Sequence, residues 1–198
     1  MSPRSQAKSA QIRQETQKRI AAAAFSLIAQ HGFEVTSVED IAKAAGVSKG
    51  LIYTYYKSKE HLLQELVTEA LRDGEQVLPS IMDSPDPSVV LNNIIRWFFK
   101  QLRERPEEWR LMTEVTLRLD RYPFMHDIVS AKMTGYVNVM QGLLLKLGYE
   151  DPLGEARLLA ALLDGVGIQA VVIREGYPLD EVEQAMLAKY QGDAGNHK

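Results

Sequence analysis

Apolar residues recur every three or four positions along most of this chain, which is the spacing of one face of an α-helix. No stretch of useful length alternates between apolar and polar residues in the manner of a strand. The pattern therefore predicts an all-α protein of about nine helices. The first ends at Gly32 and the others lie near residues 38–45, 49–55, 59–73, 89–103, 107–119, 124–147, 152–175 and 179–190.

The two shortest predicted helices carry clear start and stop signals. Ser37 can cap the first of them, and Asp40 follows three residues later as the partner in a capping box. Gly46 stands where a left-handed residue commonly ends a helix, and Ser48 can cap the next one. Two short helices joined by a turn of three or four residues predict a helix-turn-helix.

The second short helix presents polar and aromatic side chains on its outward face. With Val47 and Ile52 directed toward the core, the residues on or near the exposed side are Lys49, Gly50, Leu51, Tyr53, Thr54 and Tyr55. Lysine can donate to O6 and N7 of guanine, threonine can contact a base edge or a thymine methyl group, and tyrosine hydroxyls reach phosphates. Helix-turn-helix units also occur in proteins that never touch DNA, so these residue types alone leave both interpretations open.

A longer pattern surrounds these two helices. Gly32-Phe33 precedes Thr36-Ser37, residues 41–50 are IAKAAGVSKG, and residues 53–62 are YTYYKSKEHL. This series resembles the DNA-binding domain of TetR-family transcriptional regulators, with the family's spacing over about residues 17–63. Only Tyr56 departs from the commonest form, because phenylalanine is frequent at that position.

The resemblance implies which residues contact DNA. They are Thr36, Ser37, Ser48, Lys49, Gly50, Leu51, Tyr53, Tyr55 and Lys59, and the chemistry of the outward face adds Thr54. Glu39 occupies a position at which some relatives place a base-contacting side chain. A carboxylate there either accepts a hydrogen bond from N4 of cytosine or faces solvent, and we favour solvent.

The resemblance and the breaks in the pattern together divide the chain into four segments. We expect a flexible basic arm over residues 1–15, a helix-turn-helix domain over 16–63, an effector-binding and dimerisation domain over 64–192, and a disordered tail over 193–198. The charge distribution agrees with an anionic partner at the N-terminal end. Residues 1–60 carry a net charge of +4, whereas the whole chain carries −3.

The predicted helix over residues 152–175 is apolar on nearly all sides, so it has to be covered on two faces. The resemblance implies that the last two long helices form a four-helix bundle with their copies in a second subunit. The dimer interface is then expected at Leu158, Leu162, Gly165, Val166, Gln169, Val182 and Met186. The alternative is that one face is monomer core and the other is weakly exposed.

Aromatic and methionine residues on the central helices are candidates for an effector pocket, because they suit an apolar and adaptable cavity. These are Trp97, Phe98, Trp109, Met112, Phe124, Met133, Tyr136 and Met140. The same residues at helical spacing also form ordinary cores, and that alternative stays open.

Several classes of function have no support in the sequence. The chain has no cysteine, no phosphate-binding loop and no recognisable catalytic motif, so we expect neither an enzyme nor a cofactor. His126 and Asp127 are adjacent and do not face one way on a helix, so no metal site is expected. No uncharged apolar run approaches the roughly 18 residues of a membrane span, and the polar N-terminus does not resemble a secretory signal. We therefore expect a cytoplasmic protein without membrane contact.

These observations predict a regulator that binds a near-palindromic operator as a homodimer and releases it when a small apolar or amphipathic molecule binds. A corepressor or activator mechanism would use the same parts with the opposite sign. The competing hypotheses are a helical-bundle enzyme or ligand carrier that has lost DNA binding, and an adaptor that binds only protein. The effector, the operator, the target genes and a dimer-of-dimers arrangement are not determined by the sequence.

Overall fold

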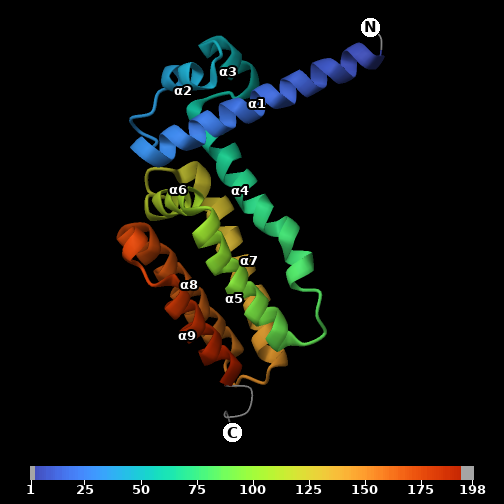
Figure 1. Cartoon of the computed structure of the whole chain (residues 1–198), viewed down its shortest axis with the longest axis vertical. Coiled ribbons are helices and arrows are strands. Elements are labelled where there is room, and N and C mark those ends of the chain that lie inside the picture. The colour runs from blue at the N-terminus through green and yellow to red at the C-terminus, as the bar shows by residue number, and fades with distance from the viewer. Residues whose placement is uncertain (1–2, 193–198) are drawn as a thin grey trace. The chain divides into compact units, whose positions relative to one another are not determined.

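The computed structural model describes residues 3–192, and the side chains of residues 8–72 and 76–190. Over residues 3–192 it contains nine α-helices, two short 3-10 helices and no strand, which confirms the predicted fold class (Figure 1). The predicted disordered tail at 193–198 lies outside the described residues. The chain divides into two compact units, Met1–Ala70 and Leu71–Lys198, and the division falls within one helix.

The first unit contains three helices and the start of a fourth: α1 (Pro3–His31), α2 (Val38–Ala45), α3 (Lys49–Tyr55) and the first half of α4 (Lys59–Ile81). Helix α1 packs against α2, and α2 against α3. The core is formed by one apolar face from each helix, including Ile20, Ala24, Ile28, Ile41, Ala42, Ala45, Ile52, Leu62 and Leu63. This small core fixes α2 and α3 relative to each other.

Helix α1 begins much earlier than the sequence pattern indicated. Residues 3–15 were predicted as a flexible arm, but the helix starts at Pro3. Gln, Ala, Lys, Arg and Glu predominate in this segment, and all of them favour helices. The amide of Gln11 donates to Glu15 one turn later, and the hydroxyl of Thr16 donates to the carbonyl of Ile12. The helix over these residues therefore rests on local interactions rather than on an apolar face.

Helix α4 also differs from its predicted length. It was expected to end near Asp73 but extends to Ile81, with Pro79 inside its last turn. A proline there removes only one backbone donor and leaves most of the helix intact. The two units therefore divide after Ala70 within this continuous helix, and the boundary expected at residue 63 lies in the same helix.

The second unit contains the rest of α4 and the remaining elements: α5 (Pro87–Glu104), α6 (Pro106–Leu117), η1 (Pro123–Met125), α7 (His126–Lys146), α8 (Pro152–Ile173), η2 (Arg174–Gly176) and α9 (Leu179–Gly192). Helix α7 packs along α8, and α5 packs along α9 and α7. Asp86 and Asp151 cap α5 and α8, each followed by proline at the first helical turn, as the sequence predicted for Asp151.

Gly167 lies at the contact between α8 and α6. A Cβ atom at this position would lie 3.3 Å from both Cε3 and Cζ3 of Trp109, which is tighter than ordinary van der Waals contact. The ring of Trp109 also packs edge-on against Phe98, with centroids 5.0 Å apart. A glycine inside α8 is therefore explained by the close approach of an indole ring.

Helix α8 is unusual in its apolar surface. With η2 it forms a 25-residue segment, Pro152–Gly176, that contains an 18-residue window of mean hydropathy 1.8 and is long and apolar enough to cross a membrane by length and composition alone. The sequence pattern predicted no such segment because Asp164 divides the apolar run. One side of α8 is already covered, since Ala156, Leu159 and Leu163 belong to the core of the second unit.

Candidate nucleic-acid interface

The turn between α2 and α3 is held by hydrogen bonds at both helix ends. At the start of α2, the Ser37 hydroxyl accepts from the Asp40 amide at 3.1 Å, and the Ser37 amide donates to the Asp40 carboxylate at 3.1 Å. Gly46 ends α2 with φ of 64°, the left-handed conformation, and the Val47 amide donates to the carbonyl of Ala42. Ser48 then caps α3 by accepting from the amide of Leu51. The predicted helix-turn-helix and its caps are confirmed.

The N-terminal part of α3 is open to solvent beside the start of α2. Lys49 and Tyr53 have about half of their side-chain or residue surface exposed, and Ser48, Gly50 and Thr54 are also exposed. No other part of the described chain lies within 4 Å of a Cβ atom built on Gly50. The backbone of α3 is therefore accessible at Gly50, as the close approach of a helix to the major groove requires.

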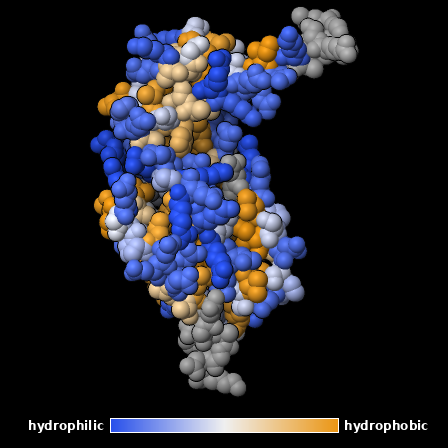
Figure 2. Space-filling model, in the orientation of Figure 1, coloured by the Kyte–Doolittle hydropathy of each residue, from blue (hydrophilic) through white to orange (hydrophobic). Residues whose placement is uncertain are grey.

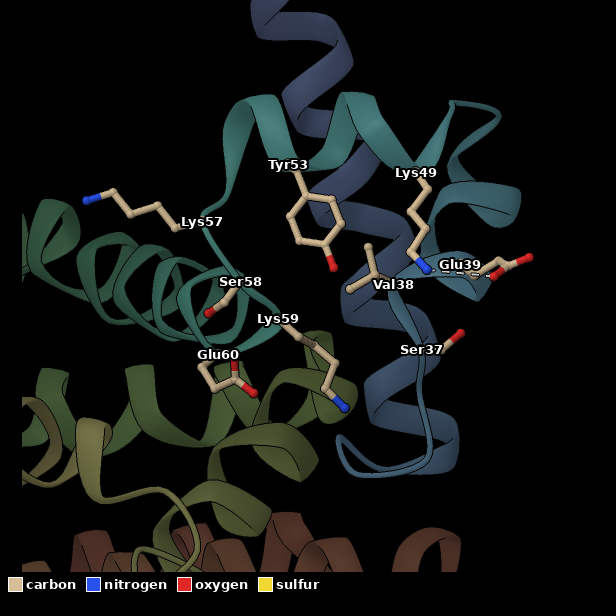
Figure 3. A pocket seen from close by; sticks show the side chains of 9 residues that line it. All are labelled: Ser37, Val38, Glu39, Lys49, Tyr53, Lys57, Ser58, Lys59 and Glu60. Carbon is tan, nitrogen blue, oxygen red and sulfur yellow. Dashed lines mark ion pairs between the residues drawn. The ribbon is translucent and has the colours of Figure 1, made fainter.

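An open groove of about 570 Å³ lies between α2, α3 and the start of α4, and Figure 3 shows the side chains that line it. Its lining is largely polar: Ser37, Val38, Glu39, Lys49, Tyr53, Lys57, Ser58, Lys59 and Glu60. The ammonium groups of Lys49 and Lys57, among hydroxyls, suit contact with phosphate oxygens. The N-terminus of α2 adds its own positive dipole end.

Glu39 is largely exposed at this groove, which is compatible with both expected roles, a contact to cytosine N4 and exposure to solvent. Its carboxylate lies 3.8 Å from the ammonium of Lys49, and 80% of its side-chain surface is exposed. The ion pair joins the second residue of α2 to the first residue of α3. It places a negative charge beside the lysine that was predicted to contact a base.

Thr36 does not have the predicted role. The side chain is 4% exposed, and its hydroxyl donates to the carbonyl of Gly32 at 2.8 Å. The prediction that this side chain contacts DNA is therefore corrected. Thr36 closes the loop that follows α1, where Gly32 adopts a φ of 89°. The sequence could not show this, because a threonine before a helix can either donate its hydroxyl to the backbone or contact DNA.

The other predicted contact residues differ in accessibility. Leu51 and Tyr55 are half-buried, and Tyr55 packs between Tyr56 and the guanidinium of Arg13, which lies 5.6 Å from its ring centroid. The Thr54 hydroxyl donates to the carbonyl of Gly50 within α3. Both hydrogen-bonding groups of Ser37 are engaged with Asp40, although the residue is exposed.

Lys59 is also engaged inside the first unit. Its ammonium donates to the carbonyl of Phe33 at 2.8 Å and to that of Thr36 at 3.1 Å, and it lies 4.2 Å from the centroid of the Phe33 ring. Two residues that the sequence analysis did not single out lie at this surface instead. Lys57 is exposed and is one of the residues that line the groove (Figure 3), and Arg13 lies over Tyr55. The signal in the sequence that could have identified these two residues is a basic side chain next to the predicted helix-turn-helix.

The predicted effector residues do not form one group. Phe98 and Met140 belong to the core of the second unit, and Trp109 packs against that core. Met133 and Tyr136 are exposed on α7, where the ammonium of Lys132 lies 5.6 Å from the Tyr136 ring. Trp97, Met112 and Phe124 are half-buried. For Phe98 and Met140 the structure favours the core interpretation.

The residues predicted at the dimer interface also differ in burial. Leu158, Leu162 and Gln169 are exposed on α8, and Gly165 and Val182 are half-buried. Val166 and Met186 are 7% and 6% exposed and pack in the core, so their assignment to an interface is corrected. The periodicity of a helix that is apolar on all sides does not show which side meets its own core. The large apolar side chains that are exposed on α8 are Leu158, Leu162, Ile168, Val172 and Ile173.

Among the side chains that the structure describes, no group of three or more His, Asp or Glu residues could hold a metal ion. His126 lies beside Asp127 at 3.3 Å, and both are exposed.

This architecture defines an all-helical protein with an N-terminal helix-turn-helix and a separate helical second unit. Comparison with known families gives the same division. Residues 20–66 match the model of the bacterial regulatory proteins of the tetR family, and residues 87–190 match the C-terminal domain of BetI-type transcriptional repressors. The chain belongs to the TetR family, whose members are transcriptional regulators rather than enzymes.

Individual relatives agree with this assignment. The chain is 32% identical over 106 residues to an uncharacterised helix-turn-helix regulator of Bacillus subtilis, YhgD, and 30% identical over 123 residues to a fatty acid metabolism regulator of the same organism. These matches cover 53% and 62% of this chain. They span 51% and 62% of the relatives' own length.

Solved structures extend the likeness over most of the chain. The fatty acid degradation regulator FadR of Bacillus halodurans has a TM-score of 0.74 and 26% identity, with 89% of this chain and 95% of that chain covered. A regulator of Saccharomonospora viridis in complex with choline has a TM-score of 0.78 and 22% identity, with 91% and 97% covered. The latter likeness concerns the fold alone.

Proposed function

We propose that the protein is a homodimeric transcriptional repressor that binds an operator through α3 and leaves it when a small apolar or amphipathic molecule binds the second unit. The observation that carries the proposal is the exposed N-terminal part of α3, where Lys49, Gly50 and Tyr53 stand beside a groove lined with lysines. Lys49 supplies donors for guanine, and the Tyr53 hydroxyl supplies a phosphate contact. This surface belongs to the segment that matches the family model.

The exposed apolar side of α8 supports a dimer. Leu158, Leu162 and Val172 are 60%, 43% and 72% exposed. They lie on one side of α8, and the opposite side of this helix packs in the core. Figure 2 shows apolar residues reaching the surface in several patches on the face that it presents. An apolar helix face is stabilised when a second copy covers it, and a two-fold dimer requires a near-palindromic operator. The cytoplasm, where the DNA lies, is the corresponding location.

The nature of the effector is supported by the relatives and by the residues of α5–α7. Two relatives are regulators of fatty acid metabolism or degradation, so a molecule with an apolar chain is the first candidate class. Half-buried aromatic and thioether groups, among them Trp97, Met112 and Phe124, are suited to an apolar ligand. The ligand must bind the DNA-bound and free conformations with different affinity, because equal affinity shifts no equilibrium.

Helix α4 belongs to both units, so a movement that the ligand causes in the second unit is transmitted along this helix to the DNA-binding unit. It begins at Lys59 in the first unit and continues without a break to Ile81 in the second. A ligand that displaces the second half of this helix would change the spacing of the two α3 helices in a dimer.

The test is a fluorescence-anisotropy titration of DNA from upstream of the protein's own gene, repeated at several salt concentrations with a scrambled competitor. Specific binding should exceed non-specific binding by at least about 10³. Lys49→Ala and Tyr53→Ala should remove that preference while the dimer persists. Medium- and long-chain fatty acids are then added to the complex, with choline as the comparison. Equal and weak binding to both DNAs, followed by failure to select any site from a random DNA pool, would overturn the proposal.

A further inference from the structure

The ammonium of Lys59 is surrounded by backbone carbonyls. It donates to Phe33 O at 2.8 Å, Thr36 O at 3.1 Å and Glu34 O at 3.4 Å. We call these three oxygens the carbonyl cluster. An ammonium group has three N–H donors, and the cluster offers an acceptor for each. The ring of Phe33 lies on another side, with its centroid 4.2 Å from the Nζ atom.

The carbonyl cluster belongs to the loop that joins α1 to α2. Phe33 and Thr36 are each 4% exposed and anchor this loop in the first unit, whereas Glu34 and Val35 between them are exposed. The loop ends at Ser37, the residue that caps α2 and begins the groove. Lys59 is the first residue of α4, 23 positions after Thr36. Its side chain therefore ties the start of α4 to the segment that determines where α2 begins.

A phosphate contact from this ammonium would require it to leave the cluster. The carbonyls of Phe33 and Thr36, on residues that are each 4% exposed, would then lose a charged hydrogen-bond donor, which is unfavourable. The ammonium would also lose the Phe33 ring. The family resemblance implies a DNA contact at Lys59, but its side chain already has a complete set of partners without DNA.

We propose that Lys59 is a positioning residue, whose ammonium fixes the loop over residues 33–36 and thereby the N-terminus of α2, rather than a donor to a DNA phosphate. This proposal rests on the proposed function, since its effect is measured on DNA binding. A phosphate-contacting lysine contributes to the dependence of affinity on salt, with a slope of about 0.9 for each phosphate neutralised. A positioning lysine acts through geometry and leaves that slope nearly unchanged.

The test uses the full-length protein and a DNA site that the wild type selects from a random pool. Lys59→Met is compared with Lys57→Met, which removes the same charge from an exposed side chain at the same groove. We expect Lys59→Met to lose at least about tenfold more affinity than Lys57→Met at equal salt, with a salt slope equal to that of the wild type. A slope shallower by about 1.8, which is about 0.9 for each of the two Lys59 side chains in a dimer, with a loss that disappears at high salt, would overturn the proposal.

Two further measurements distinguish a positioning role of Lys59 from a general loss of folding and from the loss of its charge alone. Lys59→Arg keeps the charge, but a planar guanidinium cannot direct its donors to three converging carbonyls in the same way. We expect weaker DNA binding, whereas a phosphate contact would give wild-type or tighter binding. Amide hydrogen exchange in the absence of DNA should be faster at residues 33–40 in both variants than in Lys57→Met. Unchanged exchange there would also overturn the proposal.

The exchange experiment needs no DNA, so it stands even where the proposed function fails. If the wild type selects no site from the pool, DNA binding is disproved while exchange at the loop still decides whether Lys59 holds it. If the wild type selects a site and Lys59→Met binds it like the wild type, only the positioning role is disproved.

Discussion

The carboxylate of Glu39 lies 3.8 Å from the ammonium of Lys49, across the turn that joins α2 to α3. Both side chains are mostly exposed, so this ion pair contributes little to stability, on the order of 0.2–1 kcal/mol. The pair also bears on DNA binding. The pair places a negative charge at the surface that would meet phosphates and engages the lysine that would donate to a base.

The first prediction concerns this pair. Glu39→Gln should tighten DNA binding about two- to fivefold, because Lys49 no longer has to leave an ion pair and one repulsive charge is removed. Fluorescence anisotropy on the selected site measures the change. Glu69→Gln, which removes the same charge from an exposed position on α4, serves as the control. Weaker binding confined to sites with one particular C·G pair would instead show that Glu39 accepts from cytosine N4.

The second prediction concerns the capping box at the start of α2. Hydrogen bonds from the Ser37 hydroxyl and amide lower the pKa of the Asp40 carboxyl below its usual value. Because the folded-state pKa is lower than the unfolded one, the carboxylate stabilises the fold above about pH 4, and this contribution disappears as the pH falls through the folded-state pKa.

Urea unfolding of the wild type and Asp40→Ala between pH 6 and pH 2.5 measures this effect. The stability difference between the two proteins should be constant near neutral pH and should shrink at the acidic end. A difference that does not depend on pH would show that the ionised carboxylate is not responsible. Ser37→Ala should cost about 1 kcal/mol, as other losses of a helix N-cap do.

The third prediction concerns the contact between α8 and α6. Gly167→Ala would place a methyl group 3.3 Å from two carbon atoms of the Trp109 ring, so the indole has to move. We expect an overpacking cost that exceeds the gain in helix propensity, giving a net loss of about 1 kcal/mol. Thermal unfolding and the emission maximum of tryptophan fluorescence report it.

Gly142→Ala is the matched control for Gly167→Ala. Gly142 lies on α7, is exposed, and has nothing within 4 Å of a built Cβ atom. Alanine there should stabilise the protein by about 0.5–1 kcal/mol. If both substitutions stabilise equally, the indole moves without cost and the close approach does not explain the glycine.

Local signals predicted the helix-turn-helix well. The Ser37–Asp40 capping box, the left-handed Gly46 and the Ser48 cap depend on residues within four positions of one another, so the sequence contains the whole interaction. Roles that depend on distant partners could not be predicted in this way. Lys59 finds its acceptors 23–26 residues earlier, and nothing in the pattern distinguishes a lysine on carbonyls from one that faces DNA.

The second unit shows the same limit. Helix α8 is apolar on both sides, and the sequence alone could not assign Val166 to the core and Leu162 to the surface. That assignment depends on where α7 and α6 pack. Met186 on α9 was likewise placed at the dimer interface, but it packs in the core beside α5. Periodicity gives the number of apolar faces, whereas packing partners determine what each face contacts.

The last prediction tests the apolar side of α8 as a dimer interface. Leu162 is 43% exposed between Leu158 and Val172 on that side, so Leu162→Glu would bury a charge in the interface and should convert the dimer to a monomer at micromolar concentration. Leu145→Glu is the control, because Leu145 is 64% exposed on α7 and lies outside this side of α8. Light scattering coupled to size-exclusion chromatography measures the mass of each variant.

The monomeric variant should also lose most of its affinity for the operator, since the two half-sites of the operator would be bound independently. A wild-type monomer, or a Leu162→Glu variant that remains dimeric, would show that another surface joins the subunits or that none does.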